Sequence, residues 1–231
     1  MLESKGNNYR TGFIMSDTGG ENMIQTGEYT CLEILLRTAE GKNGYVILRD
    51  TEGRECRYDA GQKYYRWLKL PVKRQSCYEI ISREAEISLA YLSGCEKILE
   101  EGIRYIDPMD GGQCLSTREA AEYYDTPYRE QYHFAPWKNW MNDPNGLCWY
   151  QGYYHMYYQY NPHGQEWNNM YWGHAVSPDL VHWTHLPIVL EPQKEVLEQA
   201  DMLKGGAFSG SAIALENETV FYLTRHLGPM E

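Results

Sequence analysis

The chain has 231 residues, of which 42% are hydrophobic and 23% charged, a composition that excludes a disordered, collagenous or coiled-coil protein. Its formal net charge of −11 argues against binding to nucleic acid or to an anionic membrane through a basic surface. The aromatic residues comprise 21 Tyr and 7 Trp but only 4 Phe. Because Tyr and Trp combine an apolar face with a polar tip, this bias suits strand-rich folds and sugar-binding surfaces.

The N-terminus and the cysteines bear on the cellular compartment and on metal binding. The first residues contain no apolar stretch of the kind found in signal peptides, and we therefore expect a cytoplasmic protein without a membrane span. The six cysteines are widely spaced and form no C-x-x-C pair. We expect reduced, mostly buried thiols, no zinc site and no cofactor.

The composition changes sharply near residue 131, which predicts two domains. The part before it carries 17 Lys and Arg, whereas the part after it carries 4, together with all seven His and six of the seven Trp. We expect the following division: a flexible N-terminal arm over 1–27, a small accessory domain over 28–107, a linker with a short helix over 108–131, and the start of a second domain over 132–231.

The accessory domain shows short strand-like segments separated by turn signals. In the first of them, Leu32, Ile34 and Leu36 share one face because strand side chains alternate. Thr51-Glu52-Gly53 predicts a hairpin. The predicted strands cover 30–37, 44–50, 54–59, 63–70, 77–82, 86–92 and 97–101. Such spacing favours a small antiparallel β-sandwich.

A helix and further strands are predicted after residue 107. The sequence Ser116-Thr117-Arg118-Glu119 fits a capping box that opens a helix over 116–124. Hairpin signals at Gln151-Gly152, Pro178-Asp179-Leu180 and Glu216-Asn217-Glu218 then alternate with strand patterns over 145–150, 153–160, 171–177, 181–185, 208–215 and 219–225. Four successive strands form an up-and-down meander, the unit of a propeller blade.

The segment Trp140–Gly146 is the most informative in the chain. It places Asp143 between Asn142 and a proline, and both Asp-Pro and Asn-Gly are strong turn signals. The residues by themselves therefore predict a turn. A carboxylate at the entry of a strand, flanked by an Asn and by aromatic residues, also lies where a sugar could meet it.

Several separate motifs after residue 132 occur in an order that resembles glycoside hydrolase family 32, the invertase, levanase and inulinase family. They are Trp140–Gly146, Tyr158–Pro162, Glu166-Trp167, Trp172–Ala175, Asp179–Trp183 and Phe208–Ala212. The resemblance covers less than half of the chain, and residues 1–131 resemble no family that we can name.

The resemblance implies a five-bladed propeller, so we expect an all-β chain with a sandwich-like domain followed by the first one and a half blades. It also implies retaining hydrolysis of terminal β-fructofuranosyl residues of sucrose or fructans, without a metal. Asp143 would be the nucleophile that attacks C2 of the fructosyl unit. The residues that the resemblance assigns to substrate binding are Asn142, Gln159, Trp167, Phe208 and Ser209.

Two of these assignments have structural alternatives in the sequence pattern. Gln159 follows His155 and Tyr157 on one strand face, and the strand pattern by itself predicts a solvated face or a hydrogen bond across the strands. With the resemblance, we prefer the role of a ligand for a fructose hydroxyl group. Phe208 could be a core residue at the start of a strand.

Two further motifs of the family do not follow Phe208–Ala212 in this sequence: an Arg-Asp-Pro, whose Asp stabilises the transition state, and a Glu-Cys, whose Glu is the acid/base. We therefore expect an N-terminal fragment that is inactive by itself. Open blade edges would allow self-association. A non-catalytic fructan-binding or decayed protein and a fructosyltransferase remain the alternatives.

Overall fold

The structure is a computed structural model that describes residues 23–107, 113–115, 125–130, 132–199 and 202–229. Strands dominate it, and helices α1 (Ile98–Glu101) and α3 (Lys194–Glu198) have four and five residues. Among the described residues no helix has the length and apolar character needed to cross a bilayer.

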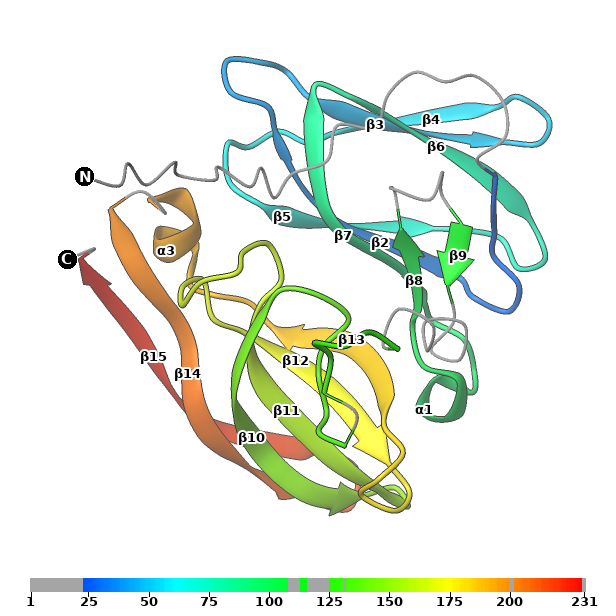
Figure 1. Cartoon of the computed structure of the whole chain (residues 1–231). Coiled ribbons are helices and arrows are strands. Elements are labelled where there is room, and N and C mark those ends of the chain that lie inside the picture. The colour runs from blue at the N-terminus through cyan, green and yellow to red at the C-terminus, as the bar shows by residue number, and fades with distance from the viewer. Residues whose placement is uncertain (1–22, 108–112, 116–124, 131, 200–201, 230–231) are drawn as a thin grey trace.

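The first part of the chain forms two antiparallel sheets that face each other (Figure 1). One sheet has the order β1 (Met23–Gln25), β6 (Cys77–Arg83), β3 (Tyr45–Asp50) and β4 (Glu55–Asp59). The other has the order β5 (Arg66–Pro71), β2 (Cys31–Thr38), β7 (Ala85–Ser93), β8 (Arg104–Asp107) and β9 (Gln113–Leu115). This arrangement confirms the predicted all-β, sandwich-like fold.

Alternation along β2 distributes its side chains between two hydrophobic cores. Leu32, Ile34 and Leu36 point into the core between the two sheets, as predicted. Leu35 points to the opposite face, where it joins a second core shared with the later part of the chain. Both faces of this strand are therefore buried, which explains its nearly continuous apolar sequence.

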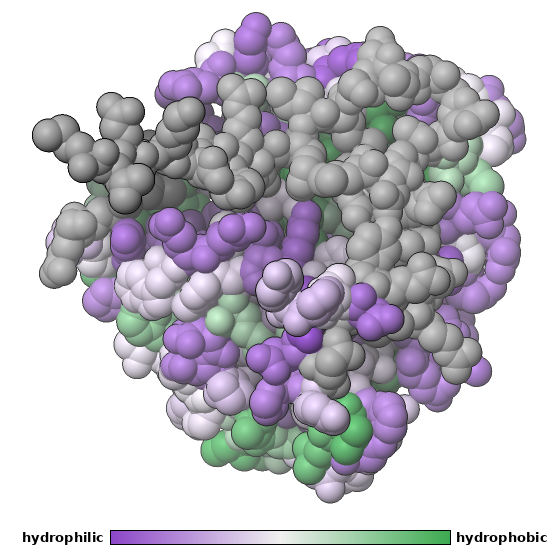
Figure 2. All heavy atoms as spheres, viewed as in Figure 1, coloured by the Kyte–Doolittle hydropathy of each residue, from purple (hydrophilic) through white to green (hydrophobic). Residues whose placement is uncertain are grey.

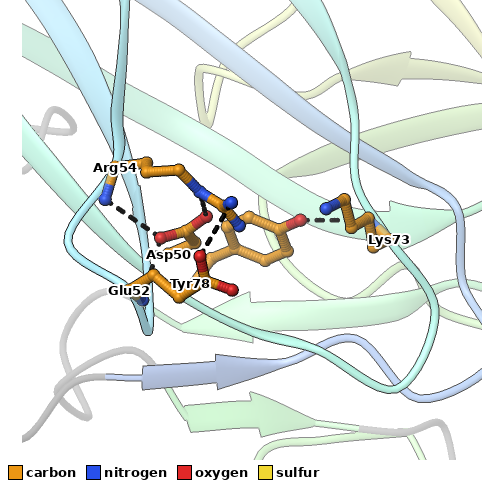
Figure 3. Close-up of polar contacts among 5 residues, drawn as sticks. All are labelled: Asp50, Glu52, Arg54, Lys73 and Tyr78. Carbon is orange, nitrogen blue, oxygen red and sulfur yellow. Dashed lines mark hydrogen bonds and ion pairs between the residues drawn. The ribbon is translucent and has the colours of Figure 1, made fainter.

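The predicted hairpin between β3 and β4 is present (Figure 3). The Asp50 carboxylate accepts hydrogen bonds from the backbone N–H groups of Glu52 and Arg54, at 2.9 and 3.0 Å. The Arg54 side chain pairs with the same carboxylate at 2.7 Å and thereby lowers the pKa of Asp50. Nearby, the backbone N–H of Lys73 donates to the hydroxyl group of Tyr78.

The second part forms a four-stranded antiparallel meander and the beginning of another sheet. The meander, here called the blade, has β10 (Trp140–Tyr150), β11 (Tyr153–Asn161), β12 (Tyr171–Ser177) and β13 (Thr184–Leu190) in sequence order. The strands β14 (Leu203–Ala214) and β15 (Thr219–Pro229) pair beside it. The predicted meander and the hairpins at Gln151-Gly152 and Glu216–Glu218 are confirmed.

One predicted strand is wrong, and another begins later than predicted. Residues 97–101 form α1 rather than a strand, because Gly94 and Gly102, both with positive φ, turn the chain on either side of a single helical turn. Residues 181–183 belong to a turn rather than to a strand. The Asp179 carboxylate accepts from the backbone N–H groups of Val181 and His182, at 2.9 and 2.8 Å, and β13 begins only at Thr184.

Other predicted boundaries also differ from the structure. Residues 23–25 of the predicted arm form β1, because Ile24 is buried in the sandwich core. Residues 113–115 of the predicted linker form β9, and β14 begins at Leu203 instead of 208. Most of the predicted arm (1–22) and the predicted helix over 116–124 lie outside the described residues.

The prediction of mostly buried thiols is wrong. All five cysteines for which the structure describes the side chain are free, but only Cys95 is buried. Cys56 is exposed because β4 is an edge strand with both faces largely accessible.

The sandwich packs against the blade through aromatic side chains. Tyr105 of β8 stacks on Trp137, with ring centroids 5.0 Å apart and ring planes 12° from parallel. The Tyr91 hydroxyl donates to the buried Glu33 carboxylate at 3.2 Å and accepts from the backbone N–H of Ile188 at 3.4 Å. This contact joins β2, β7 and β13, so that the sandwich supports the blade from one side.

Candidate functional site

Asp143 lies within strand β10, not in a turn as the local sequence predicts. The pairing of β10 with β11 shifts register between Met141 and Pro144 and again between Asn145 and Cys148. Proline cannot donate to a ladder, and Gly146 has a positive φ of 53°, so these residues interrupt the pairing without ending the strand. The turn signals in Trp140–Gly146 therefore produce two irregularities next to Asp143.

Asp143, Ser209 and Gln159 form a chain of hydrogen bonds from three different strands. The Ser209 hydroxyl donates to the Asp143 carboxylate at 2.5 Å. The same hydroxyl accepts from the Gln159 amide nitrogen at 3.1 Å. Asp143 and Ser209 are exposed whereas Gln159 is buried, so the chain runs from the interior of the blade to an accessible carboxylate.

Phe208 and Trp167 form an aromatic wall next to Ser209. Their ring centroids lie 5.8 Å apart with the planes at 75°, an edge-to-face contact. Phe208 lies inside β14 rather than at its start, and its carbonyl accepts from the indole N–H of Trp172 at 3.1 Å. The Trp167 side chain is 41% exposed, which leaves a ring face available to a ligand.

Asn142 is exposed on β10 next to Asp143. In the part of the chain that the structure describes, its side chain makes no hydrogen bond to the other candidate residues. Hydrogen bonds thus link Asp143, Ser209 and Gln159, and a ring contact links Trp167 to Phe208. Phe208 precedes Ser209 and Asn142 precedes Asp143 in the chain, so all six sequence-predicted residues are connected.

Sequence reasoning missed the role of Asn145 and Gly146, which it described by an Asn-Gly turn signal and by the start of the predicted strand over 145–150. The buried Asn145 side chain accepts from the backbone N–H of Gly210 at 3.2 Å, and so ties β10 to β14 next to Ser209. A Cβ atom at Gly146 would lie 2.8 Å from Tyr157 and 3.1 Å from Ala212. Both residues bring β10 close to its neighbours, and no signal in the sequence indicates these contacts with distant strands.

Two blade histidines, His155 and His174, lie next to Tyr157. His155 Nδ1 and His174 Nε2 are 3.0 Å apart, and burial lowers the pKa of both, that of His174 to about 3. Tyr157 stacks on His174 with ring centroids 4.3 Å apart. Among the described residues no group of three or more His, Cys, Asp or Glu side chains is arranged to hold a metal ion.

The site combines an exposed carboxylate, hydrogen-bonding groups and an aromatic wall on an antiparallel blade. This combination is typical of carbohydrate-active proteins. The family model of the glycosyl hydrolases family 32 N-terminal domain matches residues 133–229. This matching part of the chain contains the whole candidate site and is similar to the N-terminal domain of glycoside hydrolase family 32.

Relatives support this assignment over a limited length. A levanase from Bacillus subtilis is 50% identical over 110 residues, which are 48% of this chain and 15% of the levanase. An extracellular exo-inulinase from Aspergillus awamori is 53% identical over 96 residues, 42% of this chain and 17% of that enzyme. The chain thus spans less than a fifth of the length of either relative.

A solved structure extends the likeness to the sandwich. A family 32 glycoside hydrolase from Bifidobacterium adolescentis superimposes with a TM-score of 0.81 at 35% identity, covering 90% of this chain and 35% of that protein. Because residues 133–229 make up less than half of the chain, such coverage includes the sandwich as well as the blade. The first part of the chain, for which the sequence suggested no relative, therefore also occurs in a family 32 structure.

Proposed function

We propose that this chain carries the nucleophile and part of the fructose-binding site of a retaining β-fructofuranosidase. Asp143 attacks the anomeric carbon C2 of a terminal fructosyl unit, the bond between C2 and the leaving oxygen of the sucrose or fructan breaks, and that oxygen takes up a proton from a general acid that we have not identified in this chain. A covalent fructosyl-enzyme forms and is released when water attacks the same carbon. The names of the relatives, levanase and exo-inulinase, support a fructan as the substrate class.

The hydrogen bond from Ser209 to Asp143 is the observation that carries this proposal. The donor at 2.5 Å orients the carboxylate and leaves its second oxygen available for attack on a substrate. Because Asp143 is also exposed, an incoming sugar can reach it. Gln159 donates to Ser209, which fixes the direction in which the hydroxyl proton points.

The neighbouring groups supply substrate contacts. Trp167 and Phe208 offer aromatic surface against which the apolar face of a fructose ring can pack. Asn142, exposed next to Asp143, is available to a sugar hydroxyl group. These contacts position C2 against Asp143, and positioning of this kind lowers the barrier of the chemical step.

An activated donor tests the nucleophile without requiring an acid/base. In para-nitrophenyl β-fructofuranoside the leaving group departs as a stable phenolate and needs no protonation. We expect the chain to release para-nitrophenol and to gain the mass of one anhydrofructosyl group, located by peptide mass spectrometry on Asp143. Asp143→Asn, which keeps the shape of the side chain, should neither release the phenol nor gain the mass.

The same experiment separates the alternatives. Binding of fructo-oligosaccharide without any adduct would overturn the proposal in favour of a non-catalytic fructan-binding protein. An adduct on a residue other than Asp143 would also overturn it. Transfer of the fructosyl group to added sucrose, in preference to water, would support a fructosyltransferase.

A further inference from the structure

The connection between β11 and β12, residues 162–170, carries Trp167 and contacts the sandwich. Figure 1 shows this yellow-green connection reaching up from the blade toward the sheet that contains β5 and β7. The carbonyl of Pro162 accepts a hydrogen bond from the buried Ser88 hydroxyl of β7 at 2.8 Å. It also accepts from the Asn139 side chain at 2.5 Å.

The next residue of this connection, His163, is held by an aromatic stack. Its ring packs on Tyr65 with centroids 4.6 Å apart and planes 26° from parallel, and meets Tyr171 edge-on at 5.8 Å. The Arg37 guanidinium lies over the Tyr65 ring at 4.8 Å and pairs with Glu86 at 2.7 Å. Two sandwich residues, Tyr65 and Ser88, therefore contact adjacent residues at the beginning of the connection.

Further hydrogen bonds hold the part of the connection between His163 and Trp167. The Asn161 side chain donates to the carbonyl of Glu166 at 2.9 Å, directly before Trp167. The carbonyl of Gly164 accepts from the backbone N–H of Trp140 at 3.0 Å. A Cβ atom at Gly164 would lie only 2.6 Å from the Asn161 side chain, so this segment is closely packed.

The end of the connection is tied to β14. The backbone N–H of Met170 donates to the carbonyl of Gly205 at 2.8 Å. The carbonyl of Met170 accepts from the backbone N–H of Ala207, also at 2.8 Å. Ala207 precedes Phe208, the ring that Trp167 contacts. Trp167 thus lies between one segment held by the sandwich and another held by the strand that carries its aromatic partner.

We infer that the sandwich positions the aromatic wall of the site, with Ser88 and Tyr65 as positioning residues for Trp167. The sandwich lies outside the family model that covers the blade, and this contact gives it a role in sugar binding. The effect on sugar affinity rests on the proposed function, whereas the positioning of Trp167 is measurable without any sugar.

Fluorine NMR of the full chain labelled with 5-fluorotryptophan tests this inference. The chain has seven Trp, and Trp167→Phe identifies the resonance of Trp167. We expect Ser88→Ala and Tyr65→Ala to shift or broaden this resonance while the signals of Trp distant from the connection stay in place. Tyr65→Phe keeps the stacked ring and should restore the original position of the resonance.

Ser82→Ala is the matched control for Ser88→Ala. Ser82 is also a buried sandwich serine, and its hydroxyl donates to the carbonyl of Ala85 at 3.0 Å, within the sandwich itself. Its loss should leave the Trp167 resonance unchanged. In a titration with fructo-oligosaccharide we expect Ser88→Ala to weaken binding roughly two- to tenfold, the equivalent of one lost hydrogen bond, and Ser82→Ala to have no such effect.

An unchanged Trp167 resonance in Ser88→Ala would overturn the inference, as would an equal change in Ser82→Ala. If Tyr65→Ala does not fold, Ser88→Ala decides the question, because it removes a single hydroxyl group. If the wild-type chain fails to bind the sugar while the Trp167 resonance responds as expected, the proposed function is contradicted and the positioning role stands.

Discussion

Ser209 lies 66 positions after Asp143 in the chain, and its hydroxyl group donates a 2.5 Å hydrogen bond to the Asp143 carboxylate. This contact requires β14 to lie beside β10, although the two strands are not paired in one sheet. A second hydrogen bond joins the two strands: the Asn145 side chain, two residues after Asp143, accepts from the backbone N–H of Gly210, one residue after Ser209. The candidate site is therefore formed by the packing of one blade against the beginning of the next sheet.

Removal of the Ser209 hydroxyl should affect stability through Gln159. In Ser209→Ala the buried Gln159 amide loses its partner, and we expect the free energy of unfolding to fall by about 1–3 kcal/mol. The double variant Ser209→Ala/Gln159→Leu should be no less stable than Ser209→Ala alone, because the buried donor is gone. Urea denaturation of the four proteins measures this coupling, and strictly additive losses would contradict it.

Replacement of Trp167 should weaken sugar binding without destabilising the fold. Trp167→Ala removes a ring that is 41% exposed, and we expect a loss of about 1–3 kcal/mol in the free energy of binding with little change in the melting temperature. Trp149→Ala is a suitable control, because Trp149 is also exposed but packs on Tyr154 instead of Phe208. A large fall in melting temperature with unchanged affinity would mean that Trp167 is a core residue.

Two glycines with positive φ provide a test of the packing of β10. A methyl group at Gly146 would collide with Tyr157 and Ala212, whereas one at Gly152 would meet no atom within 4 Å. We expect Gly146→Ala to cost about 2–4 kcal/mol of stability and Gly152→Ala, which suffers only backbone strain, about 1–2 kcal/mol. Equal costs in thermal or urea unfolding would show that close packing at Gly146 is not important.

A buried histidine should make the fold sensitive to acid. Burial, with a smaller contribution from Arg129, lowers the pKa of His185 from its ordinary value of 6.5 to about 4. Between these two pH values the unfolded chain binds more protons than the folded one, so the stability that His185 contributes at neutral pH is lost as the pH falls from about 6.5 to about 4. The loss is about 1.4 kcal/mol for each pH unit.

His185→Phe removes this titration and should flatten the dependence of unfolding free energy on pH across that range. Urea denaturation at several pH values measures the slope. A slope that does not change in His185→Phe would contradict the assignment.

The strand pattern was readable from the sequence wherever apolar residues alternate between short turns. Leu32, Ile34 and Leu36 gave the face of β2 correctly, and Gln151-Gly152 gave the tightest hairpin of the blade. The sequence of Lys97–Glu101 misled because a single helical turn between two glycines is too short to show its own period.

Only part of the candidate site could be predicted from the sequence, because its contacts join distant segments. The resemblance selected Asp143, Gln159 and Ser209, but nothing in the chain order shows that a single hydroxyl group connects the other two side chains. The turn signals misled at Asp143 and Pro144, because tertiary packing extends β10 back to Trp140, before the predicted strand over 145–150. The support from Tyr65 and Ser88 depends on contacts between distant segments, which periodicity cannot reveal.

The aromatic contacts between the sandwich and the blade affect how the chain unfolds. One apolar cluster contains Leu35 and Tyr91 of the sandwich together with Met156 and Tyr158 of the blade. Separating the two parts would expose this cluster to water, at a cost that grows with the apolar area uncovered. The change in composition near residue 131 is therefore not a boundary between two units that unfold separately. We expect the slowest-exchanging amide protons on its two sides to exchange together, as one cooperative unit.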